Sequence, residues 1–315
     1  MKRRTKIVLF SVLGFIGVLA AVIAALLLWP AWPAPVVASR PADAPPATVT
    51  TAAQPLPGKL AITRVAHASV LLDFDGAQVL TDPWFTEKEE YHHGEPLGFA
   101  IKDLPKLTAV VVSHEHYDHY DIDAFAAYPD KSVPMFVATK DMASDARDKG
   151  FTNVRALEPW QSAQVGALTI TAAPGAHGTY EVTYVIQGNG NTVFFGGDSK
   201  LIPPLETELP KRFPTIDVAL LPVNGLHAGG KPVVMNDKEA AKLAGELHPA
   251  VAIPIHYKFH AGIIYDTVAL SYHGTAEGFV QAMKASSSKA DVRILLPGQR
   301  LEIVHAAAAA SEQPR

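Results

Sequence analysis

The feature that most constrains this chain is the stretch Thr108–Asp121, which reads TAVVVSHEHYDHYD. Its β-branched start predicts a buried strand, and ligand-type side chains follow at once. In an extended chain alternate side chains share one side, so His114, His116 and Asp118 should point the same way, with His119 beside them as the chain turns. Such a string arises by chance in roughly one sequence of this composition per thousand. The pattern predicts a metal-binding loop after a strand, its ligands divided between two adjacent ions.

The pattern of an apolar run followed by a ligand-type residue occurs three more times, later in the chain. PGAHGT carries His177, FFGGDS carries Asp198 and IPIHY carries His256. The chain has no cysteine, so thiolate ligands and disulfides are excluded. Five histidines and two aspartates therefore stand at predicted strand ends, enough for two metal ions that share a carboxylate. Such a set leaves positions open for water, as a catalytic metal site requires.

These strings, with HASVLL, LTDPWF, LPVNG and EAAKLAGELHPAVAIPIHY, are distributed over residues 59–304. In this order they resemble the metallo-β-lactamase superfamily. Within it the chain looks most like the branch that contains N-acyl-phosphatidylethanolamine-hydrolysing phospholipase D and the ascorbate-lactone hydrolase. The resemblance implies an α/β fold, an αββα sandwich of two mixed sheets faced by helices, with metal ions at one edge. It also implies the ligands of two ions: the first on His114, His116 and His177, the second on Asp118, His119 and His256, with Asp198 bridging them.

For such a site we expect a hydroxide held between two divalent ions to act as the nucleophile. Asp118 would orient the water and carry a proton to the leaving group. The expected activity is that of a binuclear metallohydrolase, which cleaves an ester-type bond in a phospholipid-like phosphodiester or a lactone. Zinc suits these ligands best, and Mn²⁺ and Fe²⁺ are alternatives. The competing hypothesis is a non-catalytic metal- or ligand-binding module, which the presence of all seven ligands disfavours.

The amino end predicts attachment to a membrane. Four of the first six residues are basic, and the 23 residues Ile7–Trp29 carry no charge. A bilayer-spanning helix needs roughly 20 apolar residues, whereas the apolar core of a signal peptide is usually roughly 7–15 residues long. We therefore expect an anchor with the rest of the chain outside the cytoplasm, in the periplasm or its equivalent, and a cleaved signal peptide is the alternative. The expected divisions are 1–6 (basic end), 7–29 (anchor), 30–58 (Pro/Ala-rich linker), 59–305 (hydrolase domain) and 306–315 (tail).

Within the body, local patterns predict individual elements. Residues 60–84 read as three short strands, with a hairpin turn at Asp75-Gly76. Asp121 should cap a following helix, and residues 292–304 read as a terminal hairpin. The formal net charge of −4, from 27 Lys and Arg against 31 Asp and Glu, does not favour a broad nucleic-acid surface, and we expect no nucleic-acid partner.

Other polar residues are candidates for substrate contact or for structural roles. His227 and His260 follow predicted strands near the expected site, and we predict that they contact a small-molecule or lipid-like substrate. His67 either approaches the metal site or packs in the core. Asp82 in LTDPW is expected to stabilise its own loop through an Asx-type turn. The pattern gives no oligomeric state.

Overall fold

The computed structural model describes residues 47–51 and 58–305. The strands of this part are β1 (Ala47–Thr51), β2 (Leu60–Ala66), β3 (Ser69–Phe74), β4 (Ala77–Thr81), β5 (Ala109–Val111), β6 (Met135–Val137), β7 (Val154–Ala156), β8 (Ser162–Val165), β9 (Leu168–Pro174), β10 (Val182–Gly188), β11 (Asn191–Phe195), β12 (Val218–Pro222), β13 (Leu226–Ala228), β14 (Lys231–Pro232), β15 (Val251–Ile255), β16 (Leu270–Tyr272), β17 (Asp291–Val292) and β18 (Arg300–His305). The helices are α2 (Ile122–Phe125), α3 (Lys140–Asp148), α4 (Pro203–Thr207), α5 (Leu209–Arg212), α6 (Asp237–Leu247), α7 (Ile263–Val268) and α8 (Ala276–Ala285), with a 3₁₀ turn at Ile101–Asp103.

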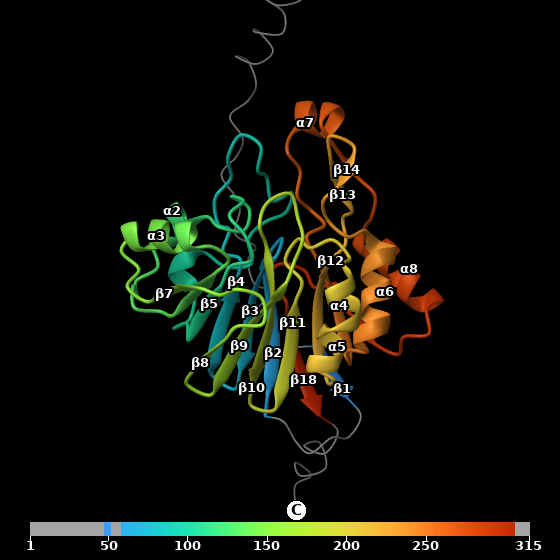
Figure 1. Ribbon diagram of the computed structural model, residues 1–315, viewed down its shortest axis with the longest axis horizontal. Helices are drawn as coiled ribbons and strands as arrows, with labels where there is room; N and C mark the ends of the chain where they lie inside the picture. Colours follow the sequence, from blue (N-terminus) through green and yellow to red (C-terminus); the bar gives the residue numbers. More distant parts are fainter. Residues whose placement is uncertain (1–46, 52–57, 306–315) are drawn as a thin grey trace, which may run out of the picture. The chain divides into compact units, whose positions relative to one another are not determined.

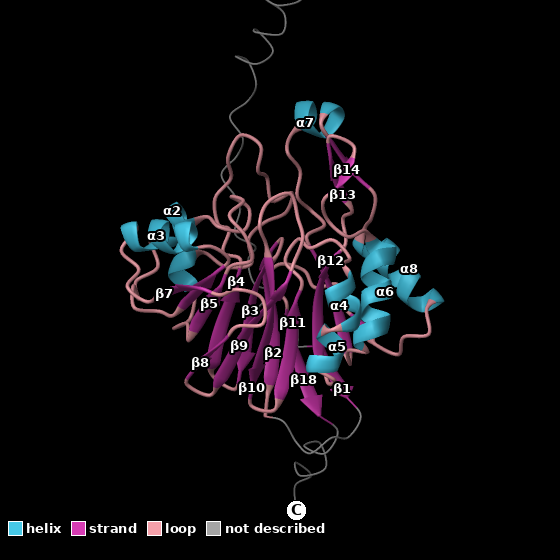
Figure 2. Ribbon diagram, in the orientation of Figure 1, coloured by secondary structure: helices cyan, strands magenta, loops and turns pink. Residues whose placement is uncertain are grey.

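Two large mixed sheets stand at the centre, with helices on either side (Figures 1 and 2). One sheet has the strand order β1-β18-β2-β3-β4-β5-β6-β7, and the other has the order β17-β15-β12-β11-β10-β9-β8. Helices α2 and α3 flank the first sheet, and α4, α5, α6 and α8 flank the second. A small third sheet has the strand order β14-β13-β16. Its strands β13 and β14 lie next to α7, beyond one edge of the two large sheets. This arrangement is the mixed α/β sandwich that the resemblance implied.

Alternation along the strands of the second sheet shows how the layers are held together. In β10, Tyr184 and Ile186 belong to one buried apolar cluster with the first sheet, whereas Val185 belongs to another with α6 and α8. Successive side chains of a strand point to opposite faces. Burying both faces removes apolar surface from water on each side, which stabilises the sandwich by roughly 25 cal/mol per Å².

Parallel strands bring several loops to one edge. β4 and β5 pair in parallel in the first sheet, and β11, β12 and β15 pair in parallel in the second. Connections after parallel strands meet where the strands end, which is where sites form in α/β folds. All the predicted metal ligands except His177 follow strands of this kind.

Several local predictions can be compared with the structure directly. β3 and β4 form the predicted hairpin, with Asp75 at φ 54° and Gly76 at φ 97°, a combination that such a tight turn favours. Asp121 caps α2 through the backbone N–H of Ala124. The predicted terminal hairpin is wrong: β17 pairs with β15 in one sheet, and β18 pairs with β2 in the other. Their partners lie far away in sequence, so no local pattern reports them.

The predicted anchor Ile7–Trp29 and the tail 306–315 lie outside the described residues. In the described ranges, no helix has both the length and the apolar character required to cross a bilayer. β1 lies within the segment 30–58 predicted as a linker, and it pairs in parallel with β18. Anchoring through Ile7–Trp29 therefore stays a prediction from the sequence.

Candidate metal centre

The predicted ligands meet at one edge of the two sheets, although they come from four separate connections, and two further connections bring His67 and Asp82 beside them. The residues and their positions are His67 between β2 and β3, Asp82 after β4, His114, His116, Asp118 and His119 after β5, His177 between β9 and β10, Asp198 after β11 and His256 after β15. Both sheets supply ligands, so the site depends on the packing of one sheet against the other.

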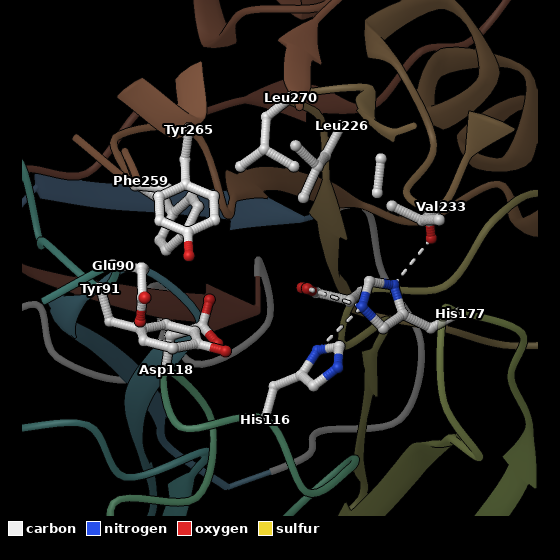
Figure 3. A pocket seen from close by; sticks show the side chains of 14 residues that line it. Glu90, Tyr91, His116, Asp118, His177, Leu226, Val233, Phe259, Tyr265 and Leu270 are labelled. Carbon is white, nitrogen blue, oxygen red and sulfur yellow. Dashed lines mark hydrogen bonds and ion pairs between the residues drawn. The ribbon is translucent and has the colours of Figure 1, made fainter. Parts of the chain in front are cut away.

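His114, His116 and His177 form the first group, as predicted. Each offers a ring nitrogen, and these nitrogens lie within 4.8 Å of one another. Nδ1 of His116 is 3.1 Å from Nε2 of His177 (Figure 3). Nδ1 of His177 donates to the carbonyl oxygen of Val233 at 2.7 Å, which leaves Nε2 of His177 unprotonated and directed at the site.

His119, Asp198 and His256 form the second group, together with His67. Oδ2 of Asp198 lies 2.7 Å from Nε2 of His256 and 3.2 Å from Nε2 of His119. The same oxygen is 3.9 Å from Nε2 of His177 in the first group. Asp198 therefore stands between the two groups, the position that a bridging carboxylate requires.

Asp118 lies at the margin of the second group. Its Oδ2 is 3.3 Å from Nε2 of His67 and 3.7 Å from Nε2 of His119. Unlike His67, it is not among the four residues whose ligand atoms gather within 4.8 Å. The structure thus places a histidine at the site that the predicted ligand set did not contain, and it keeps Asp118 within reach of both histidines.

Burial and charge give these histidines different protonation states. Burial lowers the pKa of His177 to about 4 and that of His67 to about 3, and it holds the pKa of His114 well below its usual range. Burial opposes the charged form of His119 as well, but the carboxylates of Asp198, Asp118 and Asp82 outweigh it and raise the pKa of His119 well above the ordinary value. Three neutral imidazoles and an excess of buried carboxylate charge suit a divalent cation.

Unpartnered atoms at the centre of the cluster support the same conclusion. Nε2 of His114, Nε2 of His119, Nε2 of His256 and Oδ1 of Asp198 are buried, and none has a hydrogen-bond partner among the described residues. The close approaches to Asp198 are not aligned as hydrogen bonds. Since buried polar atoms are nearly always paired, several such atoms that face one another fit a metal site. The residues present therefore fit divalent metal ions.

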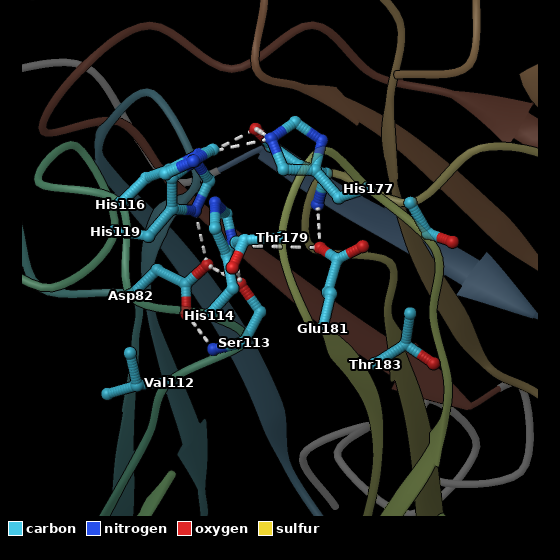
Figure 4. Close-up of polar contacts among 12 residues, drawn as sticks. Asp82, Val112, Ser113, His114, His116, His119, His177, Thr179, Glu181 and Thr183 are labelled. Carbon is cyan, nitrogen blue, oxygen red and sulfur yellow. Dashed lines mark hydrogen bonds and ion pairs between the residues drawn. The ribbon is translucent and has the colours of Figure 1, made fainter. Parts of the chain in front are cut away.

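A second layer of residues orients the ligands. Asp82 accepts hydrogen bonds from Nδ1 of His119 at 2.5 Å and from the backbone N–H and Oγ of Ser113 at 2.7 and 2.6 Å (Figure 4). Oγ of Ser113 also lies 3.0 Å from Nδ1 of His114. Asp82 therefore fixes the ring orientation of His119 and, through Ser113, supports His114. Its role is not the loop-stabilising one that the sequence suggested.

Glu181 is a further residue that sequence reasoning missed. Its Oε1 accepts the backbone N–H of Asp198 at 2.6 Å and lies 3.7 Å from Nδ1 of His114. Burial, followed by the charge of Asp198, raises the pKa of Glu181 well above its usual range. No motif marks Glu181, because it stands at the start of β10 without a neighbouring ligand. The pairing of β10 with β11 brings it beside Asp198, and the packing of the two sheets brings it near His114.

A pocket of about 380 Å³ opens beside the cluster. His116, Asp118 and His177 line its floor, and Leu226, Val233, Phe259 and Leu270 contribute an apolar wall (Figure 3). Asp198 also lines the pocket. His227 and His260, predicted to contact substrate, are not among the lining residues, although Leu226, Ala228, Phe259 and Ala261 are. Successive side chains of a strand point to opposite sides, so His227 points away from the pocket that its neighbours Leu226 and Ala228 line. Its ring instead lies 4.1 Å from that of His273, and the ring of His260 stacks on His92.

Comparison with known proteins adds relatives to this geometry. Residues 77–257 match the family model described as the β-lactamase superfamily domain. An uncharacterised Mycobacterium bovis protein is 27% identical over 288 residues, which cover 84% of this chain and 74% of that protein. A protein of Methanopyrus kandleri named as a metal-dependent hydrolase is 28% identical over 253 residues, covering 76% of this chain and 99% of its own length.

Solved structures share the fold at low sequence identity. A metallo hydrolase from Ignicoccus hospitalis superposes with a TM-score of 0.60 at 22% identity, covering 78% of this chain and 98% of its own. The isothiocyanate hydrolase from Delia radicum gut bacteria gives 0.61 at 20% identity, with 76% and 98% covered. The family match spans more than half of the chain and includes every predicted ligand. The chain belongs to the metallo-β-lactamase superfamily and is a metal-dependent hydrolase of that fold.

Proposed function

We propose that this chain uses two divalent metal ions, with zinc favoured, to hydrolyse a phosphodiester of a phospholipid-like molecule or a lactone. The observation that carries the proposal is the position of Asp198, whose Oδ2 lies within 3.9 Å of ring nitrogens from both ligand groups. The two substrate classes come from the resemblance of the sequence to the branch that contains the phospholipase D and the lactone hydrolase, which is less specific than its resemblance to the superfamily. Divalent ions bound there would lower the pKa of water and polarise the bond to be cleaved.

The side chains of the chain itself have distinct roles in this proposal. The two ligand groups would hold the ions, and Asp82, Ser113 and Glu181 would fix the ligand orientation. Asp118 lines the pocket and has a pKa held well below its usual range: burial opposes this shift, but the charge of His119 and the close approach of His67, whose Nε2 lies 3.3 Å from Oδ2, outweigh it. Its carboxylate is therefore ionised, and it can orient water at Oδ2 and move a proton to the leaving group.

Apolar groups beside the cluster support a substrate with an apolar portion. Leu226, Val233, Phe259 and Leu270 contact the same pocket as Asp118. A pocket of about 380 Å³ falls within the range of small-molecule sites, which is roughly 300–1,000 Å³. A substrate whose reacting group lies over the metal ligands and whose acyl or alkyl chain packs against this wall would contact both the polar and the apolar parts of the pocket.

The test is a metal and substrate assay on the purified full chain. We expect divalent metal in the parent protein, turnover of one class within a panel of phosphodiesters, lactones and an isothiocyanate, and loss of both in Asp198→Ala. Asp118→Asn should lower kcat at least 100-fold while the protein retains metal, because proton transfer contributes about 10²–10⁴-fold. Full turnover by metal-depleted protein would contradict the proposal. Bound metal without turnover of any substrate would favour the metal-binding module.

We also propose that Ile7–Trp29 anchors the chain and that the hydrolase domain lies on the outer side of the membrane. The support is the charge-free span of 23 residues and the basic residues before it. Protease added to intact spheroplasts should then digest the domain, and protection of the domain would contradict this orientation.

A further inference from the structure

Exposed apolar side chains are concentrated on one short helix. In the described ranges six large apolar or aromatic side chains are exposed, and four of them lie on α7: Ile263, Ile264, Tyr265 and Val268. Their exposed fractions are 66%, 59%, 47% and 81%. Soluble proteins usually scatter such residues singly, and a cluster marks an interaction site.

The single acidic residue of α7 is turned away from this surface. Oδ1 of Asp266 accepts hydrogen bonds from the backbone N–H of Ala261 at 3.1 Å and from the hydroxyl of Tyr272 at 2.6 Å. These bonds fix α7 to the segment that follows β15 and to β16. The outward face is left with Ile263, Ile264 and Val268 and no charged side chain of its own.

The apolar surface of α7 continues into the pocket beside the metal ligands. Tyr265 is exposed on α7 and also lines the pocket, as do Phe259 before the helix and Leu270 after it. Figure 1 places α7 beyond the sheet edge at which the ligands gather, next to β13 and β14. A molecule held at α7 is thus next to an apolar path that leads to Asp118.

The size of the surface argues against a second protein chain as its occupant. A stable protein–protein interface buries roughly 800 Å² on each partner, which four side chains of a six-residue helix do not supply. A lipid surface needs no such complementary area. In addition, the sequence predicts a membrane span at Ile7–Trp29, which would hold the domain close to a bilayer at high effective concentration. A small apolar patch then suffices for contact.

We propose that the face of α7 formed by Ile263, Ile264 and Val268 inserts into the interface of the lipid bilayer, so that the adjacent pocket opens towards the lipid surface. This inference rests on the predicted anchor and not on any particular hydrolytic activity. It assigns α7 a contact with lipid, and it makes an amphiphile drawn from the membrane the substrate class that reaches the pocket most directly.

The absence of cysteine from the chain permits a direct test. Ile264→Cys and Val268→Cys are made as separate variants of the full chain, so that each protein contains a single thiol. That thiol is labelled with an environment-sensitive fluorophore. Each protein is reconstituted into vesicles of phosphatidylcholine and phosphatidylglycerol (3:1) with and without lipids bearing a doxyl quencher. Leu296→Cys is the matched control, because Leu296 is 67% exposed and lies outside both α7 and the pocket lining. Intact mass shows that residues 1–29 are retained, and unchanged metal content shows that the site is preserved.

We expect emission from positions 264 and 268 to shift to the blue on reconstitution, with quenching by doxyl lipids at least twice that at position 296. Equal quenching at all three positions would overturn the proposal. A blue shift at 264 without doxyl quenching would overturn it as well, because the label would then be buried against protein and not in lipid. Because the readout needs no turnover, these outcomes are independent of the proposed hydrolysis.

Discussion

Replacement of Asp82 by asparagine tests whether the layer behind the ligands controls metal binding. The two carboxylate oxygens of Asp82 accept three hydrogen bonds, from the backbone N–H of Ser113, from Oγ of Ser113 and from Nδ1 of His119. Asparagine has nearly the same shape but only one accepting oxygen. In either orientation of the amide, its NH₂ group faces a donor: the backbone N–H of Ser113 in one, Nδ1 of His119 in the other.

The expected magnitude follows from these contacts. If the NH₂ group faces His119, the imidazole must move its proton to Nε2, the nitrogen directed at Asp198, and it can no longer bind metal through that atom. If it faces Ser113, a buried N–H is unpaired, at a cost of about 1–3 kcal/mol. Either way the imidazole loses its carboxylate partner. Loss of such a partner typically lowers metal affinity about 10–100-fold, or roughly 1.4–2.7 kcal/mol.

Competition with a chromophoric chelator measures the zinc dissociation constant of the parent and of Asp82→Asn. Urea unfolding of the same proteins measures the loss of stability. Asp73→Asn is the matched control, since Asp73 is a partly buried carboxylate that pairs with Arg300 at 2.9 Å and lies outside the metal cluster. Asp73→Asn should leave zinc affinity unchanged. A zinc dissociation constant for Asp82→Asn within twofold of the parent value would refute the idea that Asp82 orients His119.

Two further predictions concern stability. Arg64 is buried and pairs with Glu95, and its Nη1 lies 2.9 Å from Oε2 of that residue. Arg64→Met should lower the free energy of unfolding by about 3–5 kcal/mol, because it leaves the charge of Glu95 uncompensated. The double variant Arg64→Met, Glu95→Leu should recover most of this loss. Urea titration of the single and double variants measures this, and equal losses in both would contradict it. Burial lowers the pKa of His93, which stacks on Trp84, so below about pH 6.5 the unfolded chain takes up a proton that the folded chain does not. Between pH 7 and 5 the parent should therefore lose stability more steeply than His93→Gln, by up to about 1.4 kcal/mol per pH unit, and identical slopes would exclude a neutral buried His93.

The sequence was sufficient to predict the elements and ligands that local patterns encode. The hairpin at Asp75-Gly76 and the cap at Asp121 follow from turn and capping chemistry that acts over two to four residues. The order of the ligand motifs anticipated that His177, Asp198 and His256 would meet the cluster after β5. Pairing between distant strands was beyond this reasoning. β18 pairs with β2 across more than 200 residues, so nothing near residues 292–304 distinguishes that partner from a local hairpin.

At the site, the residues whose roles the sequence left open or did not reveal are those that depend on backbone direction or on a distant partner. His67 belongs to the second ligand group because the chain turns sharply between β2 and β3, with φ at 52°. Asp82 reaches partners 31 and 37 residues away in the sequence. Glu181 meets Asp198 through the pairing of β10 with β11, and it approaches His114 across the interface between the two sheets. In each case the residue type was compatible with several roles, and tertiary packing selected one of them.

Backbone strain and hydrogen bonding together explain how the ligands are held in position. His67, Asp82 and His256 all have left-handed φ values, of 52°, 33° and 54°. Such values cost of order 1–3 kcal/mol each outside glycine, although His and Asp tolerate them better than most residues. Each follows a strand that is largely buried, and the sandwich as a whole offsets the cost. Residues outside the ligand groups then fix individual rings: Asp82 holds His119, and the carbonyl of Val233 holds His177. The two sheets and this second layer therefore set the ligand positions, and metal ions would bind to a site whose geometry the protein has already imposed.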